Sequence, residues 1–309
     1  MIKVAVVGVG HLGAQHARLY GASIDARLVG VVDKDVQRAA EIASLHGVEP
    51  FKDYRELFGK VDAVSLAVPT VDHARIGVDL LEHGIDVLVE KPIATSIEEA
   101  QSLIDSAARN NRMLQVGHVE RFNPVVTMAR EAATQPQFFE IHRLSMFSPR
   151  SLDIDVVLDL MIHDLDIVLS LVHSPISEVR AVGIPVLSGK ADIANARVEF
   201  EDGCVANLTA SRVSSEKMRK LRFFQPSDYI SIDYSSQRGS VVSLRMGRVM
   251  QRKLEPPVDE PLKIELESFI DAVQTRNKPA VTGEDGLKAL ALAIRINKEI
   301  ESHGRNMRS

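Results

Sequence analysis

The chain has a single cysteine, Cys204, among its 309 residues. One thiol cannot form an internal disulfide, and it cannot build a cysteine-rich metal site. The sequence also has no apolar run long enough to cross a bilayer. Its first apolar run, Val4–Val7, is too short for the core of a signal peptide. These absences favour a soluble protein of the cytoplasm.

Neither sign of charge dominates the sequence: 37 Lys and Arg against 42 Asp and Glu give a net charge of -5. This balance offers no general attraction to nucleic acid or to an anionic membrane, so neither is expected as a partner. With 45% hydrophobic and 26% charged residues, the composition is that of an ordinary globular protein. The length is sufficient for two domains.

Short apolar runs alternate with helix-like stretches over the first 120 residues. The runs are apolar on both faces, as buried parallel strands are: Val4–Val7, Leu28–Val32, Ala63–Val68, Val87–Val89 and Met113–Val116. The stretches with helical periodicity are Leu12–Tyr20, Val36–Leu45, Asp72–Glu82 and Glu98–Asn110. Ser96 and Glu99 predict a capping box before the last helix, and Gly84 suits the end of the helix before it. This rhythm predicts a Rossmann domain with a doubly wound parallel sheet.

The pattern changes after about residue 123. Leu158–Leu171 predicts an amphipathic helix. Strand-like segments then follow one another without helices between them: Glu178–Val186, Ala194–Glu201, Val205–Val213, Leu221–Ile232, Ser240–Met246 and Val249–Leu254. Asp202-Gly203 predicts a hairpin between two of these strands. Two helices, Lys263–Thr275 and Glu284–Ile300, close the chain.

We therefore predict an α/β fold with two domains. Residues 1–122 form the Rossmann domain. Residues 123–309 form an α+β domain with a large, mostly antiparallel sheet, which binds substrate and mediates oligomerisation. Whether the last helix packs back on the first domain stays open.

The hexapeptide Gly8-Val9-Gly10-His11-Leu12-Gly13 follows the first predicted strand and opens a helix, the context in which G-x-G-x-x-G binds a dinucleotide. The first glycine permits a tight turn, the second lets backbone approach a pyrophosphate, and the third lets the helix pack on the strand. Asp33 ends the second strand, where a carboxylate accepts hydrogen bonds from ribose hydroxyls and repels a 2′-phosphate. NAD is thus favoured over NADP, although Lys34 partly offsets the charge. A tight turn without a ligand, with Asp33 capping a helix, is the alternative.

Glu90-Lys91-Pro92 ends another buried strand. Ligands of open α/β sheets bind beyond the carboxyl ends of the strands, so Lys91 is expected where a nicotinamide and a substrate meet. Pro92 constrains Lys91 and raises the chance of a cis peptide bond. A surface lysine before a loop is the alternative.

Asp159 and His163 lie four residues apart and share a helix face. A carboxylate there can orient an imidazole, which titrates near neutral pH and suits general base catalysis. A structural Asp–His pair is one alternative. Asp164 and Asp166 make a zinc site another, but hydride transfer with a nicotinamide needs no metal, so none is expected.

With these motifs the chain resembles, over nearly its whole length, the glucose–fructose oxidoreductase, inositol dehydrogenase and rhizopine catabolism family, Gfo/Idh/MocA. The matching motifs are Gly8–Gly13, Asp33, Pro69-Thr70 with His73, Glu90-Lys91-Pro92, and Asp159-x-x-x-His163 followed by Asp166. The resemblance implies that Lys91 and His163 are the catalytic pair, assisted by Asp159. It also implies dimers or tetramers formed through the outer face of the second sheet.

Motif and resemblance together give the residues expected to bind NAD: Gly8, Gly10, His11, Leu12, Gly13, Asp33, Lys34, Pro69, Thr70, His73, Glu90 and Lys91. The chain departs from many family members at two places. Residues 153–157 stand where a glycine-rich run is common, and Met161 stands where many have glycine. These departures concern the backbone on the substrate side.

A narrower resemblance, to UDP-N-acetylglucosamine 3-dehydrogenases, rests on the stretches Gly117–Pro124, Phe147–Arg150 and Asp155–Asp164. It implies NAD-dependent oxidation of a ring hydroxyl of this nucleotide sugar to a ketone, which feeds an aminotransferase. Arg121, Asn123 and Arg150 are then expected to bind substrate together with His163. Guanidinium groups bind a diphosphate in a forked geometry, and ordinary ion pairs are the alternative for the two arginines.

Two other functions stay open. One is a dehydrogenase of a free polyol or monosaccharide. The other is a non-catalytic NAD-binding sensor, against which the retention of Lys91, Asp159 and His163 argues.

Overall fold

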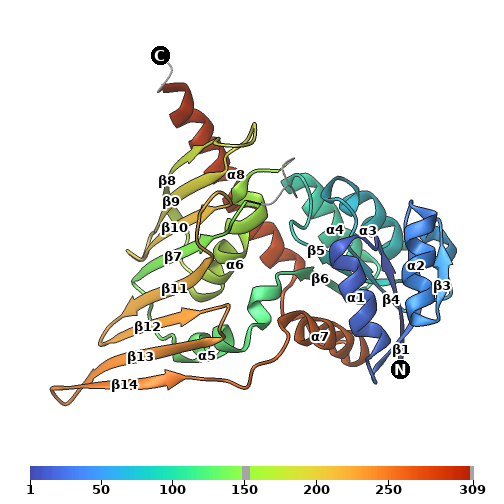
Figure 1. Cartoon of the computed structure of the whole chain (residues 1–309), viewed down its shortest axis with the longest axis horizontal. Helices are drawn as coiled ribbons and strands as arrows, with labels where there is room; N and C mark the ends of the chain where they lie inside the picture. The colour runs from blue at the N-terminus through green and yellow to red at the C-terminus, as the bar shows by residue number, and fades with distance from the viewer. Residues whose placement is uncertain (148–153, 307–309) are drawn as a thin grey trace. The chain divides into compact units, whose positions relative to one another are not determined.

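The computed structural model describes residues 1–147 and 154–306, with only the backbone of the last two (Figure 1). Contacts divide the chain into two compact units. The first comprises residues 1–119 and 260–287, and the second residues 120–259 and 288–309. Residues 260–287, which the sequence analysis counted with the second domain, thus belong to the first unit by their contacts.

The first unit is built on a six-stranded parallel sheet of order β3-β2-β1-β4-β5-β6. Its strands are β1 Ile2–Val7, β2 Ala26–Val32, β3 Glu49–Phe51, β4 Ala63–Leu66, β5 Asp86–Glu90 and β6 Leu114–Gly117. Its helices include α1 His11–Gly21, α2 Val36–His46, α3 His73–Glu82, α4 Ile97–Arg109 and α7 Pro261–Thr275. The strand order reverses between β1 and β4, which opens the crevice where such sheets bind ligands. The predicted doubly wound sheet is confirmed.

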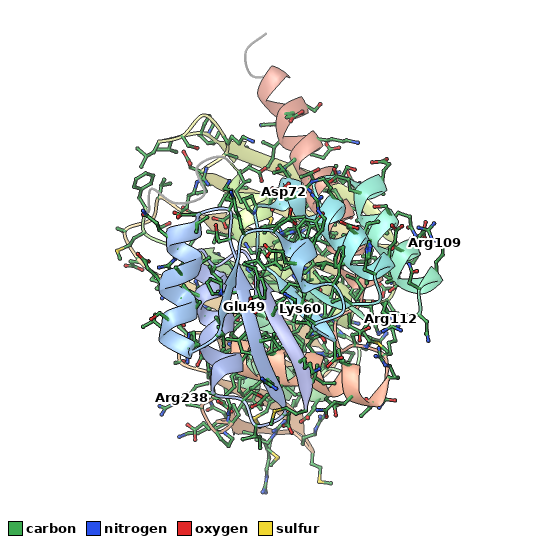
Figure 2. The ribbon with its side chains drawn as sticks, turned by 90° about the vertical axis from the view of Figure 1, so that its right-hand side faces the viewer. Glu49, Lys60, Asp72, Arg109, Arg112 and Arg238 are labelled. Atoms are coloured by element: carbon green, nitrogen blue, oxygen red, sulfur yellow. The ribbon has the colours of Figure 1, made fainter. Side chains whose placement is uncertain are left out.

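The residues at which helices of this unit begin and end can be explained by their local interactions. Gly84 has a φ of +78° just after α3, as predicted for a helix end. The Ser96 hydroxyl accepts from the Glu99 N–H at 3.2 Å and caps α4. The Glu99 carboxylate, however, accepts from the Thr95 N–H instead of returning to Ser96, so this half of the predicted capping box was wrong. Arg109 lies in the last turn of α4, where the helix dipole favours a cation, at the periphery of the unit (Figure 2).

The second unit is built on an eight-stranded sheet of order β14-β13-β12-β11-β7-β10-β9-β8. Its strands are β7 Phe138–Leu144, β8 Ile176–Ile184, β9 Ile193–Phe200, β10 Val205–Ser211, β11 Met218–Gln225, β12 Asp228–Asp233, β13 Arg238–Arg245 and β14 Arg248–Leu254. Only β7 and β10 pair in parallel, so the predicted mostly antiparallel sheet is confirmed. The helices α5 Pro124–Ala132, α6 Ile162–Leu171 and α8 Gly283–Asn306 share one hydrophobic core with a single face of this sheet (Figure 1).

Three details of this unit differ from the prediction. The single strand expected over Leu221–Ile232 is two strands, β11 and β12, because Pro226 and Ser227 form a turn in which Ser227 has a φ of +68°. Strand β7 and helix α5 were not predicted. The expected helix over Leu158–Leu171 begins as a π-helical turn, Val157–Met161, before α6. None of the helices in the described ranges combines the length and apolar character needed to cross a membrane.

Candidate active site

Each glycine of the turn after β1 has a different structural role. Gly8 has a φ of +87°, and a Cβ added there would lie 2.7 Å from the Ala67 carbonyl carbon. A Cβ on Gly13 would lie 1.8 Å from the Gly8 carbonyl oxygen, so this glycine permits α1 to pack on the turn. A Cβ on Gly10 would meet no atom within 4 Å. Gly10 therefore leaves open space just before the start of α1, where a diphosphate would approach the backbone.

Helix α1 begins at His11, and no described side chain caps it. The first N–H groups of a helix and its dipole favour an anion, so this start fits the diphosphate of a dinucleotide.

Asp33 connects the end of β2 to the glycine-rich turn. Its Oδ2 accepts from the Val9 N–H at 2.8 Å, and its Oδ1 accepts from the Asp35 N–H at 3.0 Å. Asp35, not Asp33, caps α2, by accepting from the N–H groups of Gln37 and Arg38. Each carboxylate oxygen of Asp33 still has acceptor capacity for a ribose hydroxyl.

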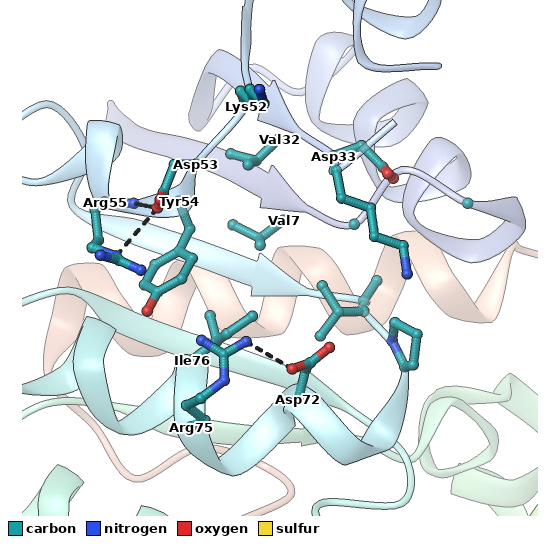
Figure 3. A pocket seen from close by; sticks show the side chains of 16 residues that line it. Val7, Val32, Asp33, Lys52, Asp53, Tyr54, Arg55, Asp72, Arg75 and Ile76 are labelled. Atoms are coloured by element: carbon teal, nitrogen blue, oxygen red, sulfur yellow. Dashed lines mark hydrogen bonds and ion pairs between the residues drawn. The ribbon is translucent and has the colours of Figure 1, made fainter. Parts of the chain in front are cut away.

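A cavity of about 520 Å³ opens between these elements of the first unit (Figure 3). Its residues come from the ends of β1, β2 and β4 and from the segments after β3 and β4: Val7, Gly8, Gly10, Val32, Asp33, Lys34, Lys52, Asp53, Tyr54, Arg55, Ala67, Val68, Pro69, Asp72, Arg75 and Ile76. Its apolar side chains suit a base and its polar side chains, Asp33 among them, suit a ribose, so the lining fits the adenosine half of a dinucleotide.

One wall of this cavity was missed by the sequence analysis. The Tyr54 hydroxyl donates to Asp79 Oδ2 at 2.7 Å. The Arg75 guanidinium pairs with Asp72 at 2.7 Å (Figure 3). Burial, followed by the bond to Asp79, raises the pKa of Tyr54 above its ordinary value. The sequence did carry a signal, since Asp53-x-x-Glu56 is a capping box that positions Tyr54 directly after β3.

His73, expected along the cofactor, is buried in protein contacts instead. Its Nδ1 lies 2.9 Å from the Pro92 carbonyl oxygen and its Nε2 lies 2.9 Å from the Val68 carbonyl oxygen. Burial lowers its pKa below the ordinary value of a histidine. The ring joins the loops that follow β4 and β5, so it contributes to the shape of the crevice rather than to a surface along it.

Lys91 follows β5 directly and is half-buried, and the Lys91–Pro92 peptide bond is cis. Glu90 is buried at the end of the strand, where one of its oxygens accepts from the Lys91 N–H at 3.2 Å. The other oxygen of Glu90 lies 3.0 Å from Nε2 of His16 on α1. The position of Lys91 at a carboxyl end of the sheet matches the prediction from the Glu-Lys-Pro motif.

In the second unit, Asp159 lies on the π-helical turn and His163 lies in the first turn of α6. Both side chains are half-buried. The turn is fixed by Asp155, whose Oδ1 accepts from the N–H groups of Val157 at 2.9 Å and Leu158 at 3.0 Å. π-helical turns are rare and often occur at functional sites.

A network of buried charges anchors α6 to the sheet. The Arg143 guanidinium on β7 forks onto Asp164, with both distances 2.8 Å, and donates to Glu120 at 2.8 Å. The Tyr234 hydroxyl also contacts Asp164, at 3.3 Å. Burial alone would raise the pKa of Glu120, but the cations Arg143 and Arg219 outweigh it and lower this pKa below its ordinary value.

Arg121 and Asn123 are part of the same buried region. Arg121 forks onto Asp166 at 2.7 and 2.8 Å, the ion-pair alternative to a contact with substrate diphosphate. Asn123 caps α5 through the Val125 N–H and donates to the Tyr234 carbonyl at 3.1 Å. Both residues thus have protein partners, and the substrate contacts expected of them stay predictions. Asp164 and Asp166 are likewise paired with guanidinium groups, those of Arg143 and Arg121. Arg150 lies outside the described residues.

A doubly wound sheet with this glycine-rich turn, an acidic residue just after β2 and a cavity that both border defines a dinucleotide-binding domain. The family model described as oxidoreductase family, NAD-binding Rossmann fold, matches residues 2–118, and the Gfo/Idh/MocA C-terminal domain model matches residues 127–249. The chain belongs to the Gfo/Idh/MocA family. It is an NAD-binding oxidoreductase that acts on CH–OH groups.

Individual relatives match nearly the whole chain. The chain is 36% identical to UDP-N-acetylglucosamine 3-dehydrogenase of Acidithiobacillus ferrooxidans, over 97% of this chain and 98% of the relative. The solved structure of that enzyme superposes with a TM-score of 0.93 at the same coverage. The chain is 27% identical to scyllo-inositol 2-dehydrogenase (NAD(+)) of Bacillus subtilis, over 95% of this chain and 92% of the relative.

Proposed function

We propose that this protein oxidises the 3-hydroxyl of UDP-N-acetylglucosamine to a ketone with NAD. The observation that carries the proposal is the 36% identity, across both units, to an enzyme of that name. The similarity to inositol dehydrogenases is lower, at 26–27% over a comparable length. Oxidation of a free polyol or monosaccharide is therefore the second candidate.

The residues of the chain supply the proton chemistry in this proposal. His163 removes the proton of the reacting hydroxyl, and Asp159 orients its imidazole. Lys91 donates to the same oxygen and stabilises the negative charge that develops on it. NAD, which the glycine-rich turn and Asp33 would hold, would supply the acceptor of the hydride. The roles of Lys91 and His163 are interchangeable in this scheme, and the pH profiles of variants at the two positions distinguish them.

Arg121 and Asn123 remain proposed contacts of the substrate. The Arg121 guanidinium is forked onto Asp166, so a contact with the diphosphate would have to share or displace this pair. Arg150 retains its expected role here, on the strength of the sequence resemblance alone.

The experiment that tests the function uses purified protein with NAD, UDP-N-acetylglucosamine and a panel of polyols and free sugars. Alcohol oxidation by NAD is often uphill, so a ketone trap or a coupled aminotransferase is included. We expect NADH formation only with the nucleotide sugar, and a product that mass spectrometry finds two hydrogens lighter. Turnover of polyols alone would replace the proposed substrate by the second candidate. Tight NAD binding without any turnover would instead support the sensor.

Asp33 is proposed to set the preference for NAD. In Asp33→Asn the negative charge is lost while one backbone N–H keeps its acceptor. We expect the ratio of kcat/KM for NAD to that for NADP to fall by about tenfold or more. Asp35→Asn is the matched control, since asparagine caps α2 as well as aspartate does. An unchanged ratio in Asp33→Asn would assign the preference to another residue.

We also propose that the chain forms a homodimer or homotetramer through the second sheet. Phe139 and Phe223 point into the core, so their neighbours Phe138 and Phe224 point to the opposite face. There Phe138, Phe224 and Tyr229 form an aromatic row, with ring centroids 5.7 and 4.8 Å apart. Light scattering of wild type and Phe224→Glu tests this, and an identical mass for both would contradict the role of this row.

A further inference from the structure

His16 is a polar residue in a buried position of α1. Its side chain is fully buried, and its Nε2 lies 3.0 Å from Glu90 Oε1, within ion-pair distance, although neither ring nitrogen has a partner with hydrogen-bond geometry among the described residues. The other Glu90 oxygen accepts from the Lys91 N–H at 3.2 Å. The neighbouring strand β6 has Gly117 at this point, and a Cβ there would lie 3.0 Å from the Glu90 carboxyl group. Helix α1, the end of β5 and strand β6 thus enclose the Glu90 carboxylate.

Burying the Glu90 carboxylate beside the His16 imidazole contributes little net stability to the fold. Removing a carboxylate and an imidazole from water has a desolvation cost, and apolar residues of similar volume often stabilise a protein as well or better. The neighbours of His16 on α1 belong to the hydrophobic core of the unit: they are Ala17 and Tyr20. A buried pair of this kind is better explained by the geometry that it fixes.

The geometry that the His16–Glu90 pair fixes is that of the backbone at Lys91. Glu90 is the residue before it, and the Glu90 carboxylate binds the Lys91 N–H group. The direction in which a side chain leaves the end of a strand depends on the backbone at that residue. Fixing Glu90 therefore fixes the base from which the Lys91 side chain extends. His16 lies on the same helix as the glycine-rich turn, so one rigid element connects the diphosphate end of the crevice to Lys91.

We propose that His16 is a positioning residue: it holds the Glu90 carboxylate on the Lys91 N–H group and thereby places the Lys91 side chain for reaction. The inference rests on the proposed function for the chemistry of Lys91. The hydrogen bond to the Lys91 N–H exists without any substrate, so it can be measured separately.

The test compares His16→Met, which cannot donate a hydrogen bond, and His16→Asn, whose shorter amide does not reach Glu90, with His16→Gln, whose longer amide can donate to it. Tyr20→Phe is the matched control. It lies one turn further along α1 and loses only a buried hydrogen bond to Ser65, whose length is 2.9 Å. Glu265 on α7 and Glu90 are the charges that face this part of α1, and none of the four variants replaces either of them.

Two measurements are made on each full-length variant. Amide hydrogen exchange, followed by mass spectrometry in the presence of NAD, reports on the peptide that contains Lys91. Steady-state kinetics with the nucleotide sugar report kcat and the KM for NAD. We expect His16→Met and His16→Asn to exchange about tenfold faster at the Lys91 peptide than at other peptides of the unit. We expect kcat to fall about 10- to 100-fold with little change in KM for NAD. His16→Gln should recover most of both, and Tyr20→Phe should match wild type.

Wild-type exchange at the Lys91 peptide in both His16→Met and His16→Asn would overturn the proposal, as would faster exchange spread evenly over the whole unit. An inactive wild type would reject the proposed substrate, yet the exchange measurement would still decide on His16.

Discussion

In Lys91→Met, we expect kcat to fall by about 10³-fold or more, while the dissociation constant for NAD changes by less than about twofold. Methionine keeps the length and apolar stem of lysine but cannot donate a proton or stabilise an oxyanion. The adenosine cavity and the glycine-rich turn do not include Lys91, so binding of the cofactor should persist. Single-turnover kinetics and isothermal titration calorimetry with NAD measure the two quantities.

Lys34→Met is the matched control, because Lys34 lines the adenosine cavity and follows the strand that ends at Asp33. It should change the affinity for NAD and leave the chemical step unaffected. A Lys91→Met variant that loses NAD binding but keeps its rate at saturating cofactor would assign Lys91 to cofactor binding instead of to the reaction.

His163→Ala tests the identity of the base. If His163 is the base, its loss removes the dependence of kcat on pH near neutrality.

The features that the sequence could predict are those encoded at short range. The Gly8–Gly13 turn follows β1 at a fixed spacing, and each of its glycines meets a local steric condition. The buried strands β4 and β5 are apolar on both faces, so they are recognisable without knowledge of their partners. Glu90-Lys91-Pro92 could be placed because the end of a strand of this kind is itself a ligand position.

Strand β7 escaped prediction because of Arg143. In the strand Phe138–Leu144 the inward residues are Phe139, Ile141 and Arg143, so a charged residue occupies a core position. This breaks the alternation on which strand prediction depends. Strand β3 has only three residues, too few for any period, and helix α5 was hidden because its cap, Asn123, was interpreted as a substrate ligand.

The partners of the buried charges could not be predicted for a different reason. Arg121 and Asp166 are 45 residues apart, and Arg143 and Asp164 are 21 residues apart on different elements. No local pattern identifies such pairs, and a buried arginine has the same sequence signature as one that binds phosphate. The sequence therefore left open whether Arg121 binds substrate or forms an ion pair, although the helix that carries His163 was correctly recognised.

The same network yields the largest expected loss of stability. Arg143→Met should lower the free energy of unfolding by about 3–5 kcal/mol, because Asp164 and Glu120 are left as buried carboxylates without their main cation. Chemical denaturation at neutral pH measures it. Arg222→Met is the matched control: Arg222 forms the same kind of pair with Glu140, at 2.9 Å, on the partly exposed face of the sheet. Its removal should cost about 1 kcal/mol or less.

The sign of the pH dependence provides a further test. The folded-state pKa of Glu120 is lowered, chiefly by Arg143 once the opposing effect of burial is overcome. Its contribution to stability is therefore complete above the pKa of the unfolded chain, about 4.3, and is lost as the pH falls through the lower folded value. In Arg143→Met the carboxylate loses its main cation and keeps only the more distant Arg219, at 3.6 Å, among the cations named here, so protonation relieves it. The stability difference between wild type and Arg143→Met should consequently narrow as the pH falls below about 4. A difference that stays constant over this range would mean that lost packing of the Arg143 side chain, rather than its charge, destabilises the variant.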